Sequence, residues 1–440
     1  MKVYNRPART DWPTLLRRPA LEVGRLDALV NDVLTQVAEH GDAALLDYTA
    51  KFDKVELEAI RVTDAEIRAA KTQVPAELKA AIRTAHDNIR RFHAAQAVEP
   101  QVIETMPGVR CWRKSVAIQR VGLYVPGGTA PLFSTVLMLG VPAVLAGCVE
   151  IVLCTPPQRD GSIHPATLYT ADLIGITTIC KMGGAQAVAA MAQGTASVPQ
   201  VDKIFGPGNQ YVTAAKQLVS RRGTAIDMPA GPSEVLVYMD ATAHPNYVAV
   251  DLLSQAEHGA DSQVVLVAET EDQVREVLLA IELHLADLPR AAAARAALDN
   301  SVAFVLSDRN EAVDLVNAYA PEHLILSLDD APAVADRIVN AGSVFLGHLT
   351  PESVGDYASG TNHTLPTNGF ARAYSGVSLD SFVKKITYQQ LTAEGLRHVG
   401  PPTELMAAAE GLEAHRRAVA VRLKRLASDR AAASRSVVED

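Results

Sequence analysis

The sequence has few cysteines and few aromatic residues, and it has no strongly basic segment. Its four cysteines include no CxxC pair, which excludes a disulfide framework and predicts a reducing compartment. The longest apolar run, "TVLMLGVPAVLAGC" at 135–148, is too short to span a bilayer and contains Pro142. A formal net charge of −9 argues against a nucleic-acid partner.

The amino-terminal residues, "MKVYNRPARTDWPTLL", have no apolar core before a small-residue cleavage site. We therefore expect no signal peptide and a cytoplasmic location. The chain has 440 residues, of which 48% are hydrophobic, so it can bury two or three domain cores. These features are typical of a globular enzyme that does not enter a membrane.

The spacing of apolar residues changes along the chain. Up to about residue 105 it predicts mostly helix, as at 20–41 and 76–96. From about residue 116, short β-branched runs alternate with helices, and the same alternation begins again at 234–239, "EVLVYM". We predict an α/β fold of two successive doubly wound, Rossmann-like modules with parallel sheets, a helical N-terminal region and a helical C-terminal tail. Such sheets bind ligands beyond the carboxyl ends of their strands.

Glycine-bearing loops follow three predicted strands of the first module, at 124–134, 181–194 and 205–216. Gln186 and Asn209 lie in the second and third loops, where their amides are placed to face a ligand. The G-x-G-x-x-G pattern of dinucleotide sites is absent, and each loop alone is as well explained by a tight turn. Together the loops predict a binding rim for a nucleotide or similar cofactor.

Polar side chains also gather in the second module. Gln255 and His258 close the helix of "VAVDLLSQAEHGADSQ", either as caps or as ligands. Asp356 and His363 lie in the loop "GDYASGTNHTLPT". They are either site residues or part of an ordinary surface loop.

An acid and an imidazole occur together twice more. Glu322 and His323 in "YAPEHLIL" can divide base and acid duties, although such a pair is often simply solvated. His415 falls on an apolar stripe of the tail helix, with Glu410 just upstream, and a lone histidine there is more often a core residue than a ligand.

Four of these side chains form a set of nitrogen and oxygen ligands without thiolate. Such a set suits zinc in a substrate-accessible site, or a harder ion such as manganese. The absence of H-E-x-x-H argues against a zinc peptidase. The set comprises Gln255, His258, Asp356 and His415.

Seven motifs in order, "VGLYVPGG", "GPGNQYV", "GPSE", "SQAEHG", "APEHL", "GDYASGTNHTLPT" and "EGLEAH", cover nearly the whole chain. Together they resemble the histidinol dehydrogenase family. The resemblance implies the last step of histidine biosynthesis, a four-electron oxidation of L-histidinol through L-histidinal to L-histidine. It also implies that two NAD molecules are reduced in turn at one site.

The resemblance assigns roles residue by residue. It implies His323 as the general base and Glu322 as the base that activates water for the aldehyde step. It implies one Zn²⁺ per subunit, held by Gln255, His258, Asp356 and His415. The implied contacts to L-histidinol are Ser233, Gln255, His258, His323, Asp356, His363, Glu410 and His415. The implied contacts to NAD are Tyr124, Gln186 and Asn209.

The family is a homodimer with intertwined tails, so the resemblance implies that Glu410 and His415 serve the partner's site. The predicted domains follow from it. They are an arm at 1–18, a substrate and metal domain at 19–123 with 233–377, an NAD-binding domain at 124–232, and an exchanged helical tail at 378–440.

Other functions stay open at this point. One is an NAD-dependent dehydrogenase of another polyol, such as a sulfonated propanediol. Two more are a metal-dependent hydrolase and a non-catalytic ligand-binding dimer. A thiohemiacetal mechanism through Cys111 or Cys148 is an alternative to the water route, and we do not favour it because Cys148 ends an apolar helix.

Overall fold

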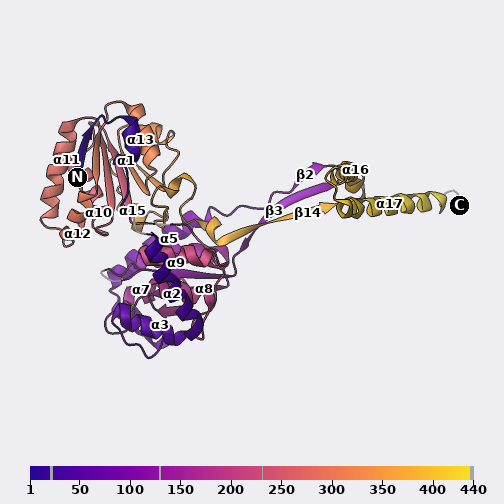
Figure 1. The fold of residues 1–440 in the computed structure, drawn as a ribbon, viewed down its shortest axis with the longest axis horizontal. Helices are drawn as coiled ribbons and strands as arrows, with labels where there is room; N and C mark the ends of the chain where they lie inside the picture. Colours follow the sequence, from indigo (N-terminus) through magenta and orange to yellow (C-terminus); the bar gives the residue numbers. More distant parts are fainter. Residues whose placement is uncertain (20–22, 128–129, 230, 437–440) are drawn as a thin grey trace. The chain divides into compact units, whose positions relative to one another are not determined.

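The computed structural model describes residues 1–19, 23–127, 130–229 and 231–436 (Figure 1). It divides into two compact units, unit 1 with residues 1–96 and 118–382, and unit 2 with residues 97–117 and 383–440. Parts of four predicted segments lie outside the described residues: the start of the helix 20–41, two positions of the loop 124–134, position 230 of the predicted NAD-binding domain, and residues 437–440 of the tail.

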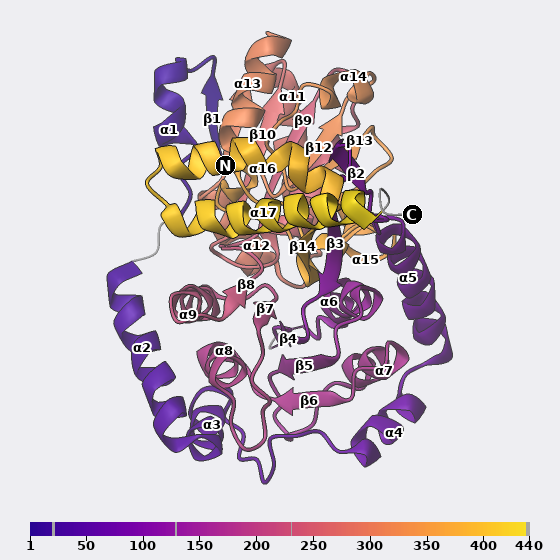
Figure 2. The ribbon, with the colours of Figure 1, turned by 90° about the vertical axis from the view of Figure 1, so that its right-hand side faces the viewer.

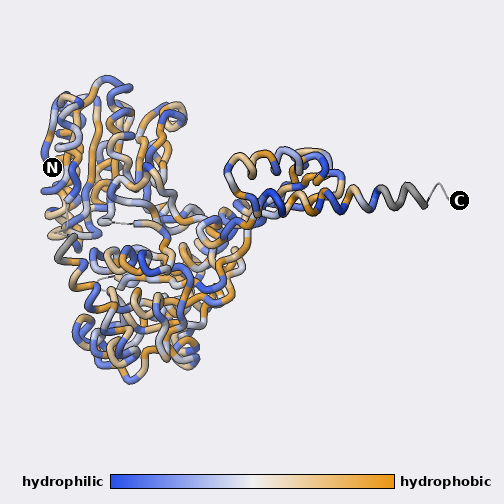
Figure 3. The backbone as a smooth tube through the Cα atoms, turned by 45° about the vertical axis from the view of Figure 1, so that its right-hand side comes forward, coloured by the Kyte–Doolittle hydropathy of each residue, from blue (hydrophilic) through white to orange (hydrophobic). Residues whose placement is uncertain are grey.

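Unit 1 contains a six-stranded sheet in which every neighbouring pair is parallel. Its inner strands are hydrophobic, as the orange segments of Figure 3 illustrate. The central strands are buried on both faces, as expected for a parallel sheet covered by helices. In spatial order the strands are β1 (Lys2–Asn5), β11 (Val302–Val305), β10 (Gln263–Ala268), β9 (Glu234–Met239), β12 (His323–Ser327) and β13 (Ser343–Leu346).

Alternate residues of β9 face opposite cores, with Val235 and Val237 on one side and Leu236 and Tyr238 on the other. The first core is closed by α10 (Pro245–Ala256), α11 (Glu271–Leu285) and α12 (Ala291–Asp299). The second is closed by α1 (Trp12–Leu15), α13 (Arg309–Tyr319) and α14 (Ala331–Ala335). The short helix α15 (Glu352–Tyr357) follows β13 and contacts α10.

Unit 1 also contains a five-stranded parallel sheet. Its strands, in spatial order, are β6 (Thr178–Lys181), β5 (Glu150–Thr155), β4 (Arg120–Tyr124), β7 (Lys203–Phe205) and β8 (Ala225–Ile226). One face is covered by α4 (Asp64–Gln73), α5 (Ala76–Ala94), α6 (Phe133–Ala146) and α7 (Pro165–Leu173). The other is covered by α2 (Val23–His40), α3 (Asp42–Tyr48), α8 (Gly184–Gln193) and α9 (Gln210–Ser220). The predicted α/β fold with two parallel sheets is confirmed.

The contacts of the N-terminal region differ from the predicted domain boundaries. Residues 1–18 are not a separate arm, because β1 pairs with β11 and Trp12 packs in the second core of the six-stranded sheet. Helices α2–α5 pack on the five-stranded sheet, whereas the prediction grouped 19–123 with 233–377. Both differences have one cause, because an amphipathic pattern shows that a face is buried but not against which sheet.

Unit 2 has an antiparallel sheet and two helices, α16 (Ala393–Ala409) and α17 (Glu413–Ser436), which lie side by side (Figure 2). Its strands are β14 (Val383–Leu391), β3 (Val109–Ala117) and β2 (Ile103–Met106). The prediction of a purely helical tail from 378 was wrong at β14, which is a strand because it pairs along its whole length with β3. The end of the tail, expected to fray, is helical to Ser436.

Short turns of other helix types complete the described fold. They are η1 (Arg9–Asp11), η2 (Thr49–Asp53), η3 (Phe370–Arg372) and η4 (Leu379–Phe382). No helix in the part of the chain that the structure describes combines the length and apolar content that crossing a membrane requires.

Candidate active site

The predicted catalytic pair lies at the amino end of a strand rather than beyond a carboxyl end. Glu322 directly precedes β12 and His323 begins it, beside Glu234 at the start of β9. Gln255 reaches the same edge because α10 runs back along the sheet, so the helix ends where the strands begin. Ligands were expected beyond the carboxyl ends of the strands, whereas this predicted pair lies at the amino end of β12.

The His323 imidazole is buried and has a partner at each ring nitrogen. Its Nδ1–H donates to the backbone carbonyl of Glu234 at 3.2 Å, and its Nε2 faces Asp356 Oδ1 at 3.2 Å. Burial alone would lower the pKa of His323, but Glu322 and Asp356 together raise it well above its ordinary value. The ring also stacks on Phe345, with 6.0 Å between ring centroids.

Glu322 is a buried carboxylate whose position is set by backbone. Its Oε2 accepts the N–H of Glu234 at 2.8 Å and lies 3.5 Å from His323 Nδ1. The acid and imidazole predicted from "APEHL" are therefore adjacent in space as well as in sequence, and neither is a solvated surface group, since they are 7% and 3% exposed.

Gln255 is buried in the last turn of α10, and its amide oxygen is not satisfied. Its Nε2 lies 3.3 Å from His323 Nδ1, whereas its Oε1 is buried without a hydrogen-bond partner. A buried acceptor without a partner is costly, and a bound cation would satisfy it. This unpaired oxygen fits the predicted role of Gln255 as a metal ligand.

His258 lies two residues past the end of α10, and its backbone N–H donates to the carbonyl of Gln255 at 3.2 Å. The predicted stacking of the two side chains on one helical turn is thus only approximate. His258 is exposed, and its charge helps to lower the pKa of Asp356.

Asp356 and His363 lie near each other in the polar segment after β13. Burial acts to raise the pKa of Asp356, but His323, His363 and His258 more than offset it, so the pKa is lowered. His363 Nδ1 donates to the Asp356 carbonyl at 2.8 Å, and its Nε2 lies 3.1 Å from the hydroxyl of Thr135 in α6. Desolvation lowers the pKa of His363.

Glu352 is a buried acid beside this cluster that the sequence reasoning missed. Burial raises its pKa to about 8, its Oε1 is hydrogen-bonded to Ser254, and its Oε2 has no partner. Ser254 uses its one hydroxyl hydrogen to donate to the carbonyl of Asp251 at 2.8 Å. The hydroxyl oxygen can then accept a hydrogen bond, and a protonated Glu352 is the donor that it needs. The only signal in the sequence was its place one helical turn before Asp356.

The predicted cofactor residues lie at the carboxyl ends of strands in the five-stranded sheet. The Tyr124 hydroxyl accepts the N–H of Gly184 at 3.1 Å, and burial raises the pKa of Tyr124 to about 12. Gln186 is buried in the first turn of α8, and Asn209 caps α9. A Cβ at Gly206 would lie 2.0 Å from the Tyr124 carbonyl, so only glycine lets these loops approach.

The remaining predicted residues are less constrained. Ser233 is half-buried just before β9, and its carbonyl accepts the N–H of Gln263 at 3.2 Å. Glu410 and His415 are exposed in unit 2, on either side of the turn between α16 and α17. Among the described residues, no three His, Cys, Asp or Glu side chains gather as a metal site. The full predicted ligand set therefore stays a prediction.

The alternative through cysteine gains no support. Cys148 is partly buried, and burial raises the pKa of its thiol to about 11, which disfavours the nucleophilic thiolate. Cys111 lies in β3 of unit 2.

Comparison with known proteins gives the family. The family model described as histidinol dehydrogenase matches residues 16–423. The chain belongs to the histidinol dehydrogenase family. The sequence prediction of that family, and of an enzyme, is therefore confirmed.

The likeness to individual relatives covers nearly the whole chain. The histidinol dehydrogenase of Bacteroides thetaiotaomicron is 58% identical over 97% of this chain and 100% of that protein. That of Pasteurella multocida is 52% identical over 94% of this chain and 96% of that protein. A crystal structure of histidinol dehydrogenase from Elizabethkingia anophelis has a TM-score of 0.94 and 54% identity, covering 97% of this chain and 98% of that one.

Proposed function

We propose that this chain is a zinc-dependent, NAD-linked enzyme that oxidises L-histidinol through L-histidinal to L-histidine, completing histidine biosynthesis. The contact of His323 with both Gln255 and Asp356 carries the proposal, because it joins the base to two proposed ligands from distant segments. Family membership and the names of the relatives support the substrate.

The donor set fits a cation. The buried Gln255 Oε1 lacks a partner, and the Asp356 carboxylate faces the same imidazole. We infer that Gln255, His258 and Asp356 hold zinc together with His415 of a second copy. When bound, the metal anchors the imidazole and amino nitrogens of histidinol and leaves the ionisation of water to the protein.

His323 performs the first proton transfer. Its Nδ1–H is held by the Glu234 carbonyl, and its Nε2, which faces Asp356 Oδ1, would accept the proton of the substrate hydroxyl once Asp356 engages the metal. Tyr124, Gln186 and Asn209 would hold NAD, which would supply the hydride acceptor.

Glu322 serves the second oxidation. The aldehyde must add water before a second hydride can leave, and the carboxylate of Glu322 accepts the proton of that water. Its Oε2 is fixed by the Glu234 N–H, so the base is placed before the aldehyde forms. The reactive aldehyde stays bound while a second NAD replaces NADH.

The chain is also proposed to act as a homodimer with exchanged tails. Unit 2 exposes large apolar side chains, including Leu405, Met406 and Val421, at 60–74%. Exposed apolar surface of this kind is typical of a surface that a second subunit covers.

The test is the yield of NADH per L-histidinol, measured with purified enzyme before and after chelation. We expect two NADH per substrate and loss of turnover with the metal, restored by added zinc. A yield of one NADH would indicate a simple alcohol dehydrogenase. Hydrolysis of amides without any NADH would indicate a hydrolase instead.

A further inference from the structure

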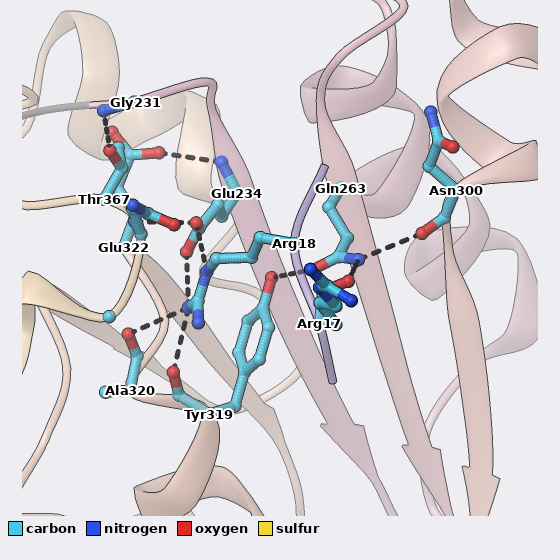
Figure 4. A network of polar contacts seen from close by, with 12 residues as sticks. Arg17, Arg18, Gly231, Glu234, Gln263, Asn300, Tyr319, Ala320, Glu322 and Thr367 are labelled. Carbon is cyan, nitrogen blue, oxygen red and sulfur yellow. Dashed lines mark hydrogen bonds and ion pairs between the residues drawn. The ribbon is translucent and has the colours of Figure 1, made fainter. Parts of the chain in front are cut away.

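A buried ion pair lies directly behind the catalytic residues. The Arg18 guanidinium binds the Glu234 carboxylate with two nitrogens, the outer contact being 2.8 Å, and the side chains are 14% and 3% exposed. Figure 4 shows this pair beside the ring of Tyr319, whose centroid lies 4.0 Å from the Arg18 guanidinium carbon. The pair joins the segment after α1 to the first residue of β9.

The nitrogen of the guanidinium that binds Glu234 Oε2 also contacts the backbone. This nitrogen, Nη2, donates to the Tyr319 carbonyl at 2.8 Å, and the Tyr319 hydroxyl donates to Gln263 Oε1 at 3.0 Å. Because each partner of Arg18 is itself fixed, the guanidinium has one orientation (Figure 4).

The backbone of Glu234 holds both catalytic side chains. Its N–H donates to Glu322 Oε2 at 2.8 Å, and its carbonyl accepts from His323 Nδ1 at 3.2 Å. A displacement of Glu234 would therefore move the water-activating carboxylate and the base together. Among the described residues, its carboxylate has one further hydrogen-bond donor, the N–H of Asn368 at 2.7 Å.

We propose that Arg18 is a positioning residue of the active site, which fixes Glu322 and His323 by holding Glu234 in place. The proposal rests on the proposed function of those two residues. Arg18 touches neither of them, so its loss should impair chemistry without removing the groups that bind substrate or metal. A purely structural anchor would instead affect stability alone.

The experiment compares Arg18→Ala holoenzyme with the wild type. We expect kcat to fall by about 10²-fold, since small misplacements of reacting groups have effects of this size. The KM for L-histidinol and the zinc content should stay near their wild-type values. The control is Arg9→Ala, which removes another arginine of the same segment, one that pairs with the exposed Asp314 and lies over the Trp12 ring.

Chemical rescue separates positioning from general destabilisation. Arg18, Gly231 and Asn368 line a cavity of about 990 Å³, which gives a small cation access to the vacated place. Millimolar guanidinium chloride should restore part of kcat in Arg18→Ala, whereas sodium chloride should not. Glu234→Gln, which keeps the backbone and the shape, should lower kcat in the same way but gain nothing from guanidinium.

A second readout needs no turnover. In histidine-labelled enzyme, the His323 ring resonance, assigned by its loss in His323→Asn, should shift in Arg18→Ala and return with guanidinium. If Arg18→Ala keeps the wild-type kcat and leaves the His323 resonance unshifted, the proposal is overturned. It is also overturned if kcat falls and the resonance shifts but guanidinium restores neither. If the wild type gives no NADH from histidinol but the resonance behaves as expected, the proposed function fails and the positioning role stands.

Discussion

At the scale of single residues, the backbone of Glu234 is the feature that places the chemistry. One peptide N–H and one carbonyl hold an acid and an imidazole that follow each other in sequence. A backbone contact needs no particular side chain of its own, so the geometry depends on where β9 begins and on what holds Glu234 there. This explains why a Glu-His dipeptide, common in loops, forms a buried pair here.

Glu322→Gln tests the water-activating role. The change removes the base but keeps the size of the side chain, so we expect alcohol oxidation to survive and aldehyde oxidation to fall by about 10²–10⁴-fold. Single-turnover measurement should then give close to one NADH per histidinol. Glu276→Gln, at an exposed position on α11, is the control. Two NADH at the wild-type rate from Glu322→Gln would refute the role.

Glu352 predicts a dependence of stability on pH. Its pKa is raised from 4.5 to about 8 by burial, so between these values the folded protein retains a proton that the unfolded chain has lost. The free energy of unfolding should therefore fall as pH rises through this window, by up to about 1.4 kcal/mol per pH unit.

The measurement is urea denaturation of the metal-free protein at several pH values. Glu352→Gln should show a shallower fall than the wild type, because its amide does not ionise. Parallel curves for the two proteins would contradict the buried, protonated state of Glu352.

At the scale of elements, the direction of α10 decides the location of the site. Because α10 returns antiparallel to β9, its last turn brings Gln255 to the amino ends of the strands. The periodicity of 248–263 predicted the helix, but not its end at Ala256 or its neighbours. Those follow from packing between α10 and α15, which lie about 100 residues apart in sequence.

A close approach between elements of unit 2 gives a prediction about stability. A Cβ at Gly395 would lie 2.1 Å from the Gly108 carbonyl oxygen, so α16 could not start against the turn between β2 and β3. Gly395→Ala should lower the free energy of unfolding by about 1–3 kcal/mol.

Thermal denaturation, followed by circular dichroism, measures this change. Glu394→Ala alters the adjacent exposed residue and should have little effect. If Gly395→Ala and Glu394→Ala have equal stability, α16 can move away from the turn between β2 and β3 without a loss of free energy of unfolding, and the prediction is wrong.

At the scale of the whole molecule, the proposed exchange of tails implies that neither copy has a complete site. Glu410 and His415 belong to unit 2, and the other proposed site residues belong to unit 1. A dimer that shares each site between subunits would link activity to assembly.

Subunit complementation tests this arrangement. His415→Ala and His323→Ala should each be inactive as homodimers. Refolded together in equal amounts, they should regain about a quarter of the wild-type sites, because a hybrid with exchanged tails has one intact site. Wild-type protein refolded alone is the control. If each tail serves its own subunit, the hybrid has two defective sites and no activity returns.

The sequence by itself determined the two parallel sheets, most of their strands and helices, and the family, because hydrophobic periodicity and ordered motifs are local properties. It also singled out Glu322, His323, Gln255 and Asp356, whose types suit the chemistry. Only the tertiary structure decided which of them meet, and it added Arg18 and Glu352. Contacts between distant segments depend on how helices return along sheets, and no local pattern records that. For the same reason β14 was predicted as helix, since its paired residues in β3 lie 266 to 282 positions away in the sequence.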